Sequence, residues 1–234
     1  MTGYLVFGGK CSKDFGIYVS GSGTFNAPER DVERIEIPGR NGELIIDSGR
    51  FKNESVSYPA FIRTAFRSSA DAAREWLLSY PGYRRLEDSY NPEYFRVASF
   101  TGPLDFDTRF LNLSGECELT FNCKPQRYLL KGEQILSGNE AMELYNPTGF
   151  AAKPLIRVYG SKGTLLAGGM QMQLKTIDGY VDIDCETESA YRGTVNCNAN
   201  IYAPTFPELP AGRTTVSFEG NIEKIEIKPR WWTI

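Results

Sequence analysis

The sequence lacks the side chain on which much enzyme chemistry depends, because none of its 234 residues is histidine. Histidine is the commonest general base near neutral pH and the usual partner of a Ser or Cys nucleophile. It is also the commonest zinc ligand. No GxSxG, P-loop or GxGxxG motif occurs. We therefore expect a protein that is not an enzyme and that uses no cofactor or metal.

The five cysteines do not form a recognisable redox or metal motif. They are scattered without a CxxC pair, and an odd number without a secretory signal argues against a disulfide framework. Isolated cysteines commonly behave as small apolar core residues. The sequence predicts free thiols at Cys11, Cys117, Cys123, Cys185 and Cys197.

Carboxylates are the remaining candidates for catalysis, because a glycosidase needs two of them opposed across a groove. Asp182 and Asp184 form such a candidate pair. They alternate with Val181, Ile183 and Cys185, however, and this pattern is typical of a strand with one solvent-exposed face. We expect solvated side chains here rather than a catalytic pair.

Residues 33–46 predict a β-hairpin. The alternating segment 33–37 runs into Pro38-Gly39-Arg40-Asn41-Gly42, and a second apolar segment follows at 43–46. Asn-Gly between two apolar segments is a strong hairpin signal, because both residues tolerate a positive φ. The additional Pro-Gly pair indicates an extended loop.

One segment, 68–78, has the pattern of a helix of about three turns. A serine cap is expected at its start, with Asp71 in the first turn. Ala70, Ala73, Trp76 and Leu77 fall on one stripe that should pack against a sheet. Trp76 and Leu77 are therefore predicted to be core anchors.

The rest of the chain is β-like, with a change of character near its middle. Residues 115–123 alternate with Cys117, Leu119, Phe121 and Cys123 on one face, and Pro125 is expected to end that strand. The stretch 131–149 is polar, so we place a domain boundary there, between domains 1–135 and 140–234. In the second domain, a strand at 155–159, a turn at 160–163 and a return strand at 164–166 begin a series of short strands that predicts a β-sandwich.

Charge and hydropathy restrict the partners. The net charge of −3 is mixed along the chain, so no basic tract favours nucleic acid. No stretch of about 18 apolar residues is present, and no membrane span is expected. The N-terminus has neither a basic segment nor an apolar run of signal-peptide length, which indicates a cytoplasmic product.

Several short motifs together resemble the distal tail (Dit) proteins of siphophages and related prophages. Each is weak alone, but they occur in the family's order over nearly the whole chain. They are 37–44 (IPGRNGEL), Trp76-Leu77 with 82–86 (GYRRL), Lys124-Pro125 with Tyr128-Leu129, 146–148 (NPT), 153–156 (KPLI), 206–212 and 229–232 (PRWW).

The resemblance implies a mainly β protein. Its N-terminal β-sandwich would carry one helix and an extended hairpin and would build a ring, commonly of six copies, and its C-terminal β-sandwich would be galectin-like. The ring would join the tail tube protein to a tail-associated, tail-fibre or receptor-binding protein. The expected location is the virion tail tip, after assembly in the host cytoplasm.

Within such a ring the predicted hairpin is our preferred contact between subunits, because its unpaired backbone can be extended by a neighbour. A simple surface turn is an equally weighted alternative for any single residue of the loop. The predicted contact residues are Ile37, Pro38, Gly39, Arg40, Asn41, Gly42 and Leu44.

Three other functions are weighed against this one. The first is a carbohydrate-binding protein of the tail tip that recognises a host cell-wall sugar. Its candidate residues are Trp231 and Trp232, which should point to opposite faces of a strand, one buried and one exposed. The second is a carboxylate-based wall hydrolase. The third is a tail-tube subunit, which the additional C-terminal domain disfavours.

Overall fold

The computed structural model describes residues 3–21, 26–109 and 113–234. The chain divides into two compact units. Unit 1 comprises residues 1–127 together with Ile234, and unit 2 comprises residues 128–233.

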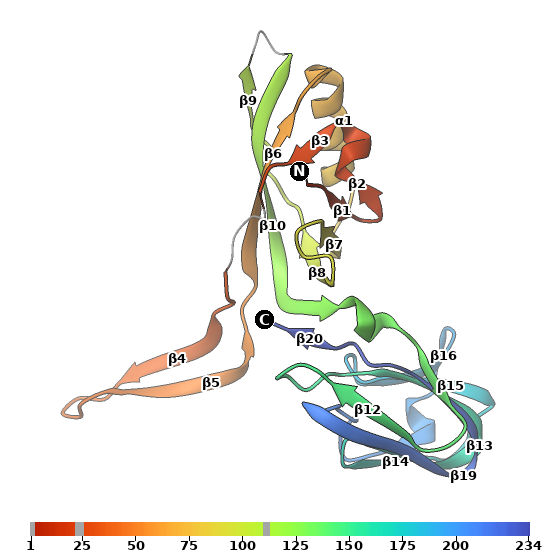
Figure 1. The fold of residues 1–234 in the computed structure, drawn as a ribbon. Coiled ribbons are helices and arrows are strands. Elements are labelled where there is room, and N and C mark those ends of the chain that lie inside the picture. Colours follow the sequence, from red (N-terminus) through yellow and green to blue (C-terminus); the bar gives the residue numbers. More distant parts are fainter. Residues whose placement is uncertain (1–2, 22–25, 110–112) are drawn as a thin grey trace. The chain divides into compact units, whose positions relative to one another are not determined.

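The strands of unit 1 form one large antiparallel sheet and a separate two-stranded hairpin (Figure 1). The sheet has the order β2-β1-β7-β8-β10-β6-β3, with β9 also paired to β10, and the hairpin is β4-β5. The strands are β1 (Leu5–Phe7), β2 (Lys10–Cys11), β3 (Ile17–Val19), β4 (Arg30–Glu36), β5 (Glu43–Phe51), β6 (Glu54–Ile62), β7 (Arg84–Asp88), β8 (Tyr94–Ser99), β9 (Phe106–Arg109) and β10 (Ser114–Leu129), and a 3-10 turn spans Ser12–Phe15.

The α-helix of unit 1, α1 (Phe66–Leu78), packs its apolar stripe into the core of this unit. Trp76 and Leu77 are buried, and Trp76 stacks on Phe15 with 4.5 Å between ring centroids. The Trp76 indole N–H donates to the carbonyl oxygen of Phe7 at 3.1 Å. The predicted serine cap is wrong: the helix begins earlier, after Ala65, and the Ser68 hydroxyl donates back to the Ala65 carbonyl.

Strand β10 continues past the proline that was expected to end it. The pairing of β10 with β6 ends at Cys123 opposite Glu54. Pro125 therefore lies beyond the ladder between β6 and β10, and its missing N–H removes no hydrogen bond from that ladder. The predicted inward face is confirmed, since Leu119, Phe121 and Cys123 are buried. All five cysteines are free, as the sequence predicts.

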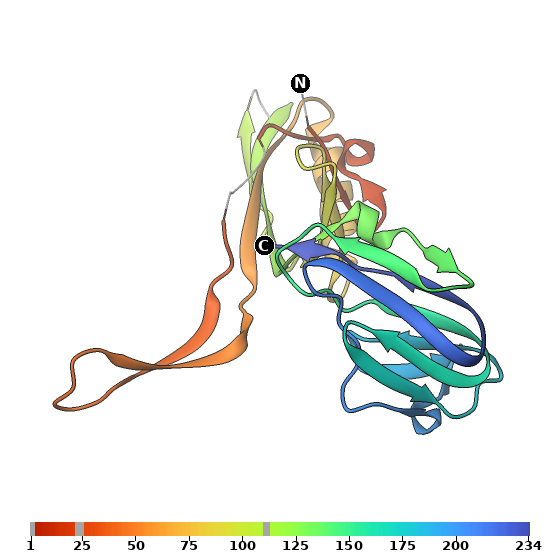
Figure 2. The ribbon, with the colours of Figure 1, turned by 60° about the horizontal axis from the view of Figure 1, so that its bottom comes forward.

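Unit 2 is built around two long neighbouring strands, β13 and β19. Each is shared by two sets of partners, β11-β19-β13-β15-β16-β17 and β12-β19-β13-β14-β18. Figure 2 shows these strands from a second side. The elements are β11 (Leu136–Gly138), β12 (Met142–Asn146), β13 (Leu155–Ala167), β14 (Met170–Leu174), β15 (Gly179–Asp184), β16 (Ser189–Arg192), β17 (Val195–Asn196), β18 (Ile201–Tyr202), β19 (Gly212–Lys228) and β20 (Trp232–Thr233), with 3-10 turns at Leu130–Glu133 and Asn198–Asn200.

The predicted turn at 160–163 is wrong, because β13 runs through it as one strand. The register of β13 with β19 shifts at Gly160, which produces a bulge rather than a reversal. Gly160 has φ 147°, and a Cβ at this position would lie 2.2 Å from the Asn221 carbonyl oxygen. The chain reverses only at Gly168-Gly169, between β13 and β14.

The polar stretch 131–149 is part of unit 2. The structural division falls between residues 127 and 128, upstream of the boundary placed by the sequence. Leu136–Gly138 pairs with β19 as β11, and Met142–Asn146 pairs with the same strand as β12. Both strands have polar or exposed positions, because each is an edge strand that pairs with β19 on one side only.

The architecture confirms the predicted fold class: mainly antiparallel β, with one helix and a hairpin in the first unit and a β-rich second unit. Each unit has its own cluster of buried apolar residues. Within the described ranges, no helix has the length and apolar character needed to cross a membrane.

Candidate assembly surface

The β4-β5 hairpin is paired in a nearly continuous register. Glu36 lies opposite Glu43, Ile35 opposite Leu44, and Arg34 opposite Ile45. The connecting loop is closed by a hydrogen bond of 3.1 Å from the Arg40 N–H to the Ile37 carbonyl. Gly39 and Gly42 have φ of 77° and 86°, a region that glycine enters without steric cost. The local sequence therefore accounts for both the turn and the register.

The register separates the hairpin side chains into two chemically different faces, because directly opposed residues point to the same side. Ile35, Leu44 and Ile46 share one face with Glu33. The other face carries Ile45 among charged residues, including the Arg34–Glu43 ion pair at 3.1 Å. We call the first side, defined by Ile35, Leu44 and Ile46, the apolar face of the hairpin.

The apolar face is solvent-exposed in the single chain. Leu44 is 46% exposed and Ile46 is 47% exposed, and every residue of β5 before Phe51 is exposed. A two-stranded hairpin without further packing is marginally stable in water, and its free strand edges can pair with another chain. In Figures 1 and 2 the hairpin is a separate ribbon of unit 1, apart from the main sheet. Such a surface is suited to burial against another molecule.

Ion pairs contribute to the order of the hairpin. Arg30 pairs with Asp47 at 3.2 Å, and Arg50 pairs with Asp31 at 2.7 Å. Exposed pairs of this kind contribute at most about 1 kcal/mol each. They align the two strands, but they leave the apolar face without cover.

The predicted contact residues all lie on this hairpin. Residues 38–42 form its exposed loop, Leu44 belongs to the apolar face, and Ile37 is half-buried. Their role as a subunit contact stays a prediction. The sequence prediction did not include Ile35 and Ile46, although the alternation of polar and apolar residues on both sides of the loop was the signal that could have identified them.

The expectation that Asp182 and Asp184 are solvated is wrong, because both are buried. Arg157 donates to both carboxylate oxygens of Asp182, at 2.6 and 2.9 Å. Arg230 donates to both carboxylate oxygens of Asp184, at 2.7 and 3.1 Å. Each carboxylate is thus neutralised by its own guanidinium.

The electrostatics of this pair of aspartates do not suit acid catalysis. Burial by itself would raise the pKa of Asp184, but the hydrogen bonds and the charge of Arg230 outweigh it and hold this pKa below its usual value. The hydrogen bond to Asp182 raises the pKa of Arg157. A general acid needs a raised carboxyl pKa, and the ion pair with Arg230 gives Asp184 the opposite shift.

Three of the thiols also lack the properties of nucleophiles. Burial raises the pKa of Cys117, Cys123 and Cys185 to about 12 in each case. A reactive cysteine needs a lowered pKa, because the thiolate is the reactive form. In the described part of the chain, no group of three or more Cys, Asp or Glu side chains is arranged to hold a metal ion.

The two adjacent tryptophans are engaged within unit 2. Trp231 is buried in its core, as expected for one of the pair. Trp232 is half-buried rather than exposed, because its ring stacks on Phe150 with 4.5 Å between centroids. The Trp232 indole N–H donates to the Ala151 carbonyl at 2.9 Å. Neither indole is an open platform for stacking a sugar.

Comparison with known proteins relates this chain to a class of phage baseplate and adsorption proteins by fold. No protein-family model matches the sequence, and neither does any curated protein. Among solved structures, a chain of the phage P2 baseplate in its activated conformation with Ca has a TM-score of 0.51 and 8% identity, over 97% of both chains.

The SPP1 Dit protein (gp 19.1) is more similar, with a TM-score of 0.69 and 13% identity over 97% of this chain and 98% of that one. It is described as a paradigm of the hub adsorption apparatus of phages that infect Gram-positive bacteria. This chain therefore has the fold of a phage distal tail protein along nearly its whole length. The resemblance drawn from the sequence motifs is confirmed at the level of the fold.

Proposed function

We propose that this chain is a structural, non-catalytic subunit of a phage tail tip. Copies of it would form a ring that joins the tail tube protein to the tail-associated, tail-fibre or receptor-binding protein. Six copies are the expected number, and the virion tail tip is the expected location. The shared fold with the SPP1 hub protein supports this role, as does the order of the sequence motifs.

The observation that carries the proposal is the apolar face of the hairpin. A closed ring uses a heterologous contact, in which one surface of each copy meets a different surface of the next. A hairpin with an uncovered apolar face and unpaired edges provides the first of these surfaces. Burying its three aliphatic side chains would contribute several kcal/mol at about 25 cal/mol per Å².

The absence of a catalytic role is supported by the chemistry of the candidate groups. The buried aspartates are paired with arginines, and the core thiols have raised pKa values. Zymography on host cell walls tests this point directly. Clearing that is lost on one Asp or Glu substitution would contradict it.

Negative-stain electron microscopy and native mass spectrometry of the purified full chain test the ring. We expect short closed rings at high protein concentration. The double substitution Leu44→Asp with Ile46→Asp should convert them to single copies while the circular dichroism spectrum stays the same, because charges on the apolar face cannot be buried. Val195→Asp, an exposed apolar position in unit 2 that is 55% exposed, is the matched control and should leave the rings intact.

The alternative outcomes are distinct. Long stacked tubes would indicate a tail-tube subunit instead. Rings that persist in the hairpin variant would show that another surface joins the copies. A single-copy mass at every concentration, also in the presence of the tail tube protein, would contradict the proposed function.

A further inference from the structure

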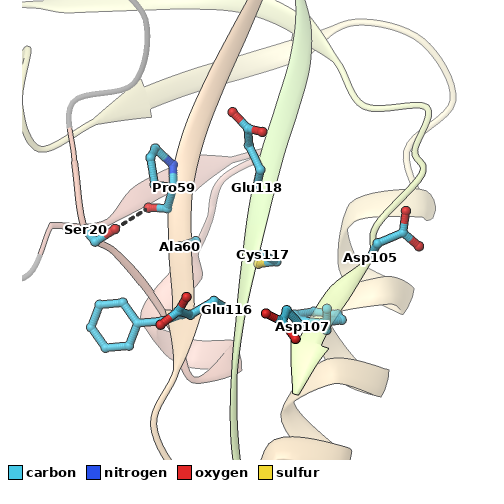
Figure 3. Close-up of a pocket in the computed structure, with 10 residues that line it drawn as sticks. Ser20, Pro59, Ala60, Asp105, Asp107, Glu116, Cys117 and Glu118 are labelled. Atoms are coloured by element: carbon cyan, nitrogen blue, oxygen red, sulfur yellow. Dashed lines mark hydrogen bonds between the residues drawn. The ribbon is translucent and has the colours of Figure 1, made fainter. Parts of the chain in front are cut away.

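A hollow of about 700 Å³ lies on unit 1, where β6, β9 and β10 meet (Figure 3). The register shows which side chains share its outer face: Glu116 lies opposite both Phe61 and Asp107, and Glu118 lies opposite Pro59. The hollow therefore combines apolar surface from Pro59 and Phe61 with carboxylates from the neighbouring strands. Its volume is within the range of about 300–1,000 Å³ that is typical of ligand pockets.

The hollow is strongly acidic. Four carboxylates line it, from Asp105, Asp107, Glu116 and Glu118. Figure 3 shows that they come from β10, β9 and the segment before β9. Arg109 pairs with Asp107 at 3.3 Å and with Glu116 at 3.5 Å. Within the described ranges, Asp105 and Glu118 have no cationic partner, so this surface has a net negative charge.

The loop at the tip of the hairpin has the complementary property. In the described part of the hairpin, Arg30, Arg34 and Arg50 each pair with a carboxylate, and Arg40 does not. Arg40 is the one charged side chain of the loop 38–42. The carboxylates nearest to it in the sequence belong to the strands on either side of the loop. The loop is also slender, since Gly39 and Gly42 have no side chains and a Cβ added at either would meet no atom within 4 Å.

We infer that the hairpin loop of one copy inserts into the acidic hollow of the next copy, with Arg40 facing Glu118 and Asp105. This inference rests on the proposed ring and assigns the second surface of its contact. Pro38 and the apolar face beside the loop would pack on Pro59 and Phe61. The unpaired cation and the unpaired carboxylates would thus meet across the junction.

The arrangement explains two features that a single copy leaves unexplained. The loop places its only charge at the far end of an exposed hairpin, and among the residues that the structure describes the hollow leaves two carboxylates without a cation. Like charges placed together across an interface weaken binding, whereas complementary charges select the partner and the register. A contact between two different surfaces is also the kind of contact from which closed rings are built.

Zero-length carbodiimide cross-linking of the full chain tests this contact. The variant Arg40→Lys keeps the charge and supplies an amine. Equal amounts of ¹⁴N- and ¹⁵N-labelled protein are mixed, so that mass spectrometry identifies links between copies from mixed-isotope peptides. We expect residue 40 to be linked to Glu118 or Asp105 between copies. The exposed Lys10 is an internal control and should not be linked to these carboxylates.

A series of charge-exchange variants provides a second test of this contact. Arg40→Glu and Glu118→Lys should each weaken self-association about tenfold or more, as measured by sedimentation. The double variant should recover most of the loss, because every junction then again joins opposite charges. Lys10→Glu and Glu93→Lys make the same charge changes at exposed positions outside the hairpin and the hollow, and should have little effect.

Each outcome decides a different point. Links between copies that involve the hairpin but not the hollow would overturn this inference and leave the ring intact. A double variant that self-associates no more strongly than either single variant would also overturn this inference and leave the ring intact. A complete lack of links between copies, together with a single-copy mass for the wild type, would overturn the ring itself.

Discussion

At the residue scale, the least expected feature is the pair of buried, ion-paired aspartates on β15. Alternation with apolar residues predicts that Asp182 and Asp184 face solvent, and they do lie on the face opposite Ile183. Their partners, Arg157 and Arg230, are 25 and 46 positions away in the sequence. Local periodicity contains no information about such distant partners. A buried carboxylate is tolerable only because the guanidinium and its hydrogen bonds are present.

The Asp184–Arg230 pair makes stability depend on pH. Asp184 has a lowered pKa in the folded chain, so the stability it contributes is present above its unfolded pKa of about 3.9 and is lost as pH falls through the lower, folded pKa. Asp184→Asn should therefore cost about 3 kcal/mol of unfolding free energy at pH 7. The difference from wild type should shrink below about pH 4. Urea unfolding over a pH series measures both values.

The control for this prediction is Asp178→Asn. Asp178 pairs with Arg192, but its side chain is 83% exposed, so the substitution should change stability by less than about 0.5 kcal/mol. A pH-independent loss in Asp184→Asn would contradict the electrostatic account. The hydrogen bonds that the backbone N–H groups of Glu186 and Thr187 donate to the Asp184 carboxylate would then be the main contribution.

At the scale of elements, the hairpin in unit 1 and the turn in unit 2 show when local signals suffice. The loop 38–42 has glycines at positive φ and flanking apolar segments, and it forms the predicted hairpin. The segment 160–163 has similar composition but forms a bulge inside β13. The difference is tertiary, because β13 pairs with β19 on both sides of the bulge, with β15 before it and with β14 after it.

Adjacent glycines in the true turn offer a matched pair of substitutions. Gly168 and Gly169 both have positive φ, of 57° and 79°. A Cβ on Gly168 would lie 1.7 Å from the Glu208 carbonyl oxygen, whereas a Cβ on Gly169 would meet nothing within 4 Å. Gly169→Ala should cost about 1–2 kcal/mol through its conformation alone. Gly168→Ala should cost clearly more, because the backbone of a second segment has to move.

Denaturant unfolding of the two variants checks this difference. Equal losses of stability would show that the left-handed backbone conformation is the whole reason for both glycines. A larger loss in Gly169→Ala would contradict the close approach of Gly168 to the segment that contains Glu208.

At the scale of the whole molecule, the division of the chain follows hydrogen bonding rather than composition. The Leu129 N–H donates to the Trp231 carbonyl at 2.8 Å, and the Arg230 N–H donates to the Gly132 carbonyl at 2.8 Å. Residues 129–132 are therefore joined to the C-terminal segment of unit 2. A polar stretch marks a domain boundary only where it makes no such bonds.

This division predicts how fragments behave. Fragment 128–234 should fold cooperatively by itself, because it retains these bonds and strand β11. Fragment 140–234 lacks both and should melt at least about 5 °C lower, which corresponds to a loss of about 1 kcal/mol or more for a domain of this size. Differential scanning calorimetry measures both temperatures. Equal melting temperatures would mean that residues 128–139 do not stabilise unit 2.

The sequence by itself was sufficient for the features that depend on short-range chemistry. The absence of histidine, the isolated cysteines, the helix with Trp76 and Leu77, and the hairpin around 38–42 follow from residue type and spacing. The order of weak motifs along the chain was also sufficient to predict the fold. These signals come from neighbouring residues or add up along the chain, so they can be interpreted without knowing the tertiary contacts.

Only the tertiary structure decided which side chains are uncovered and which are paired. It buried Asp182 and Asp184, placed Trp232 on Phe150, and brought β6, β9 and β10 together into one acidic hollow. Each of these depends on residues far apart in the sequence, whose meeting is set by strand register across a sheet. Because opposed residues share a face, the strand register decides which charged side chains meet. The pattern of residues along the sequence does not contain this register.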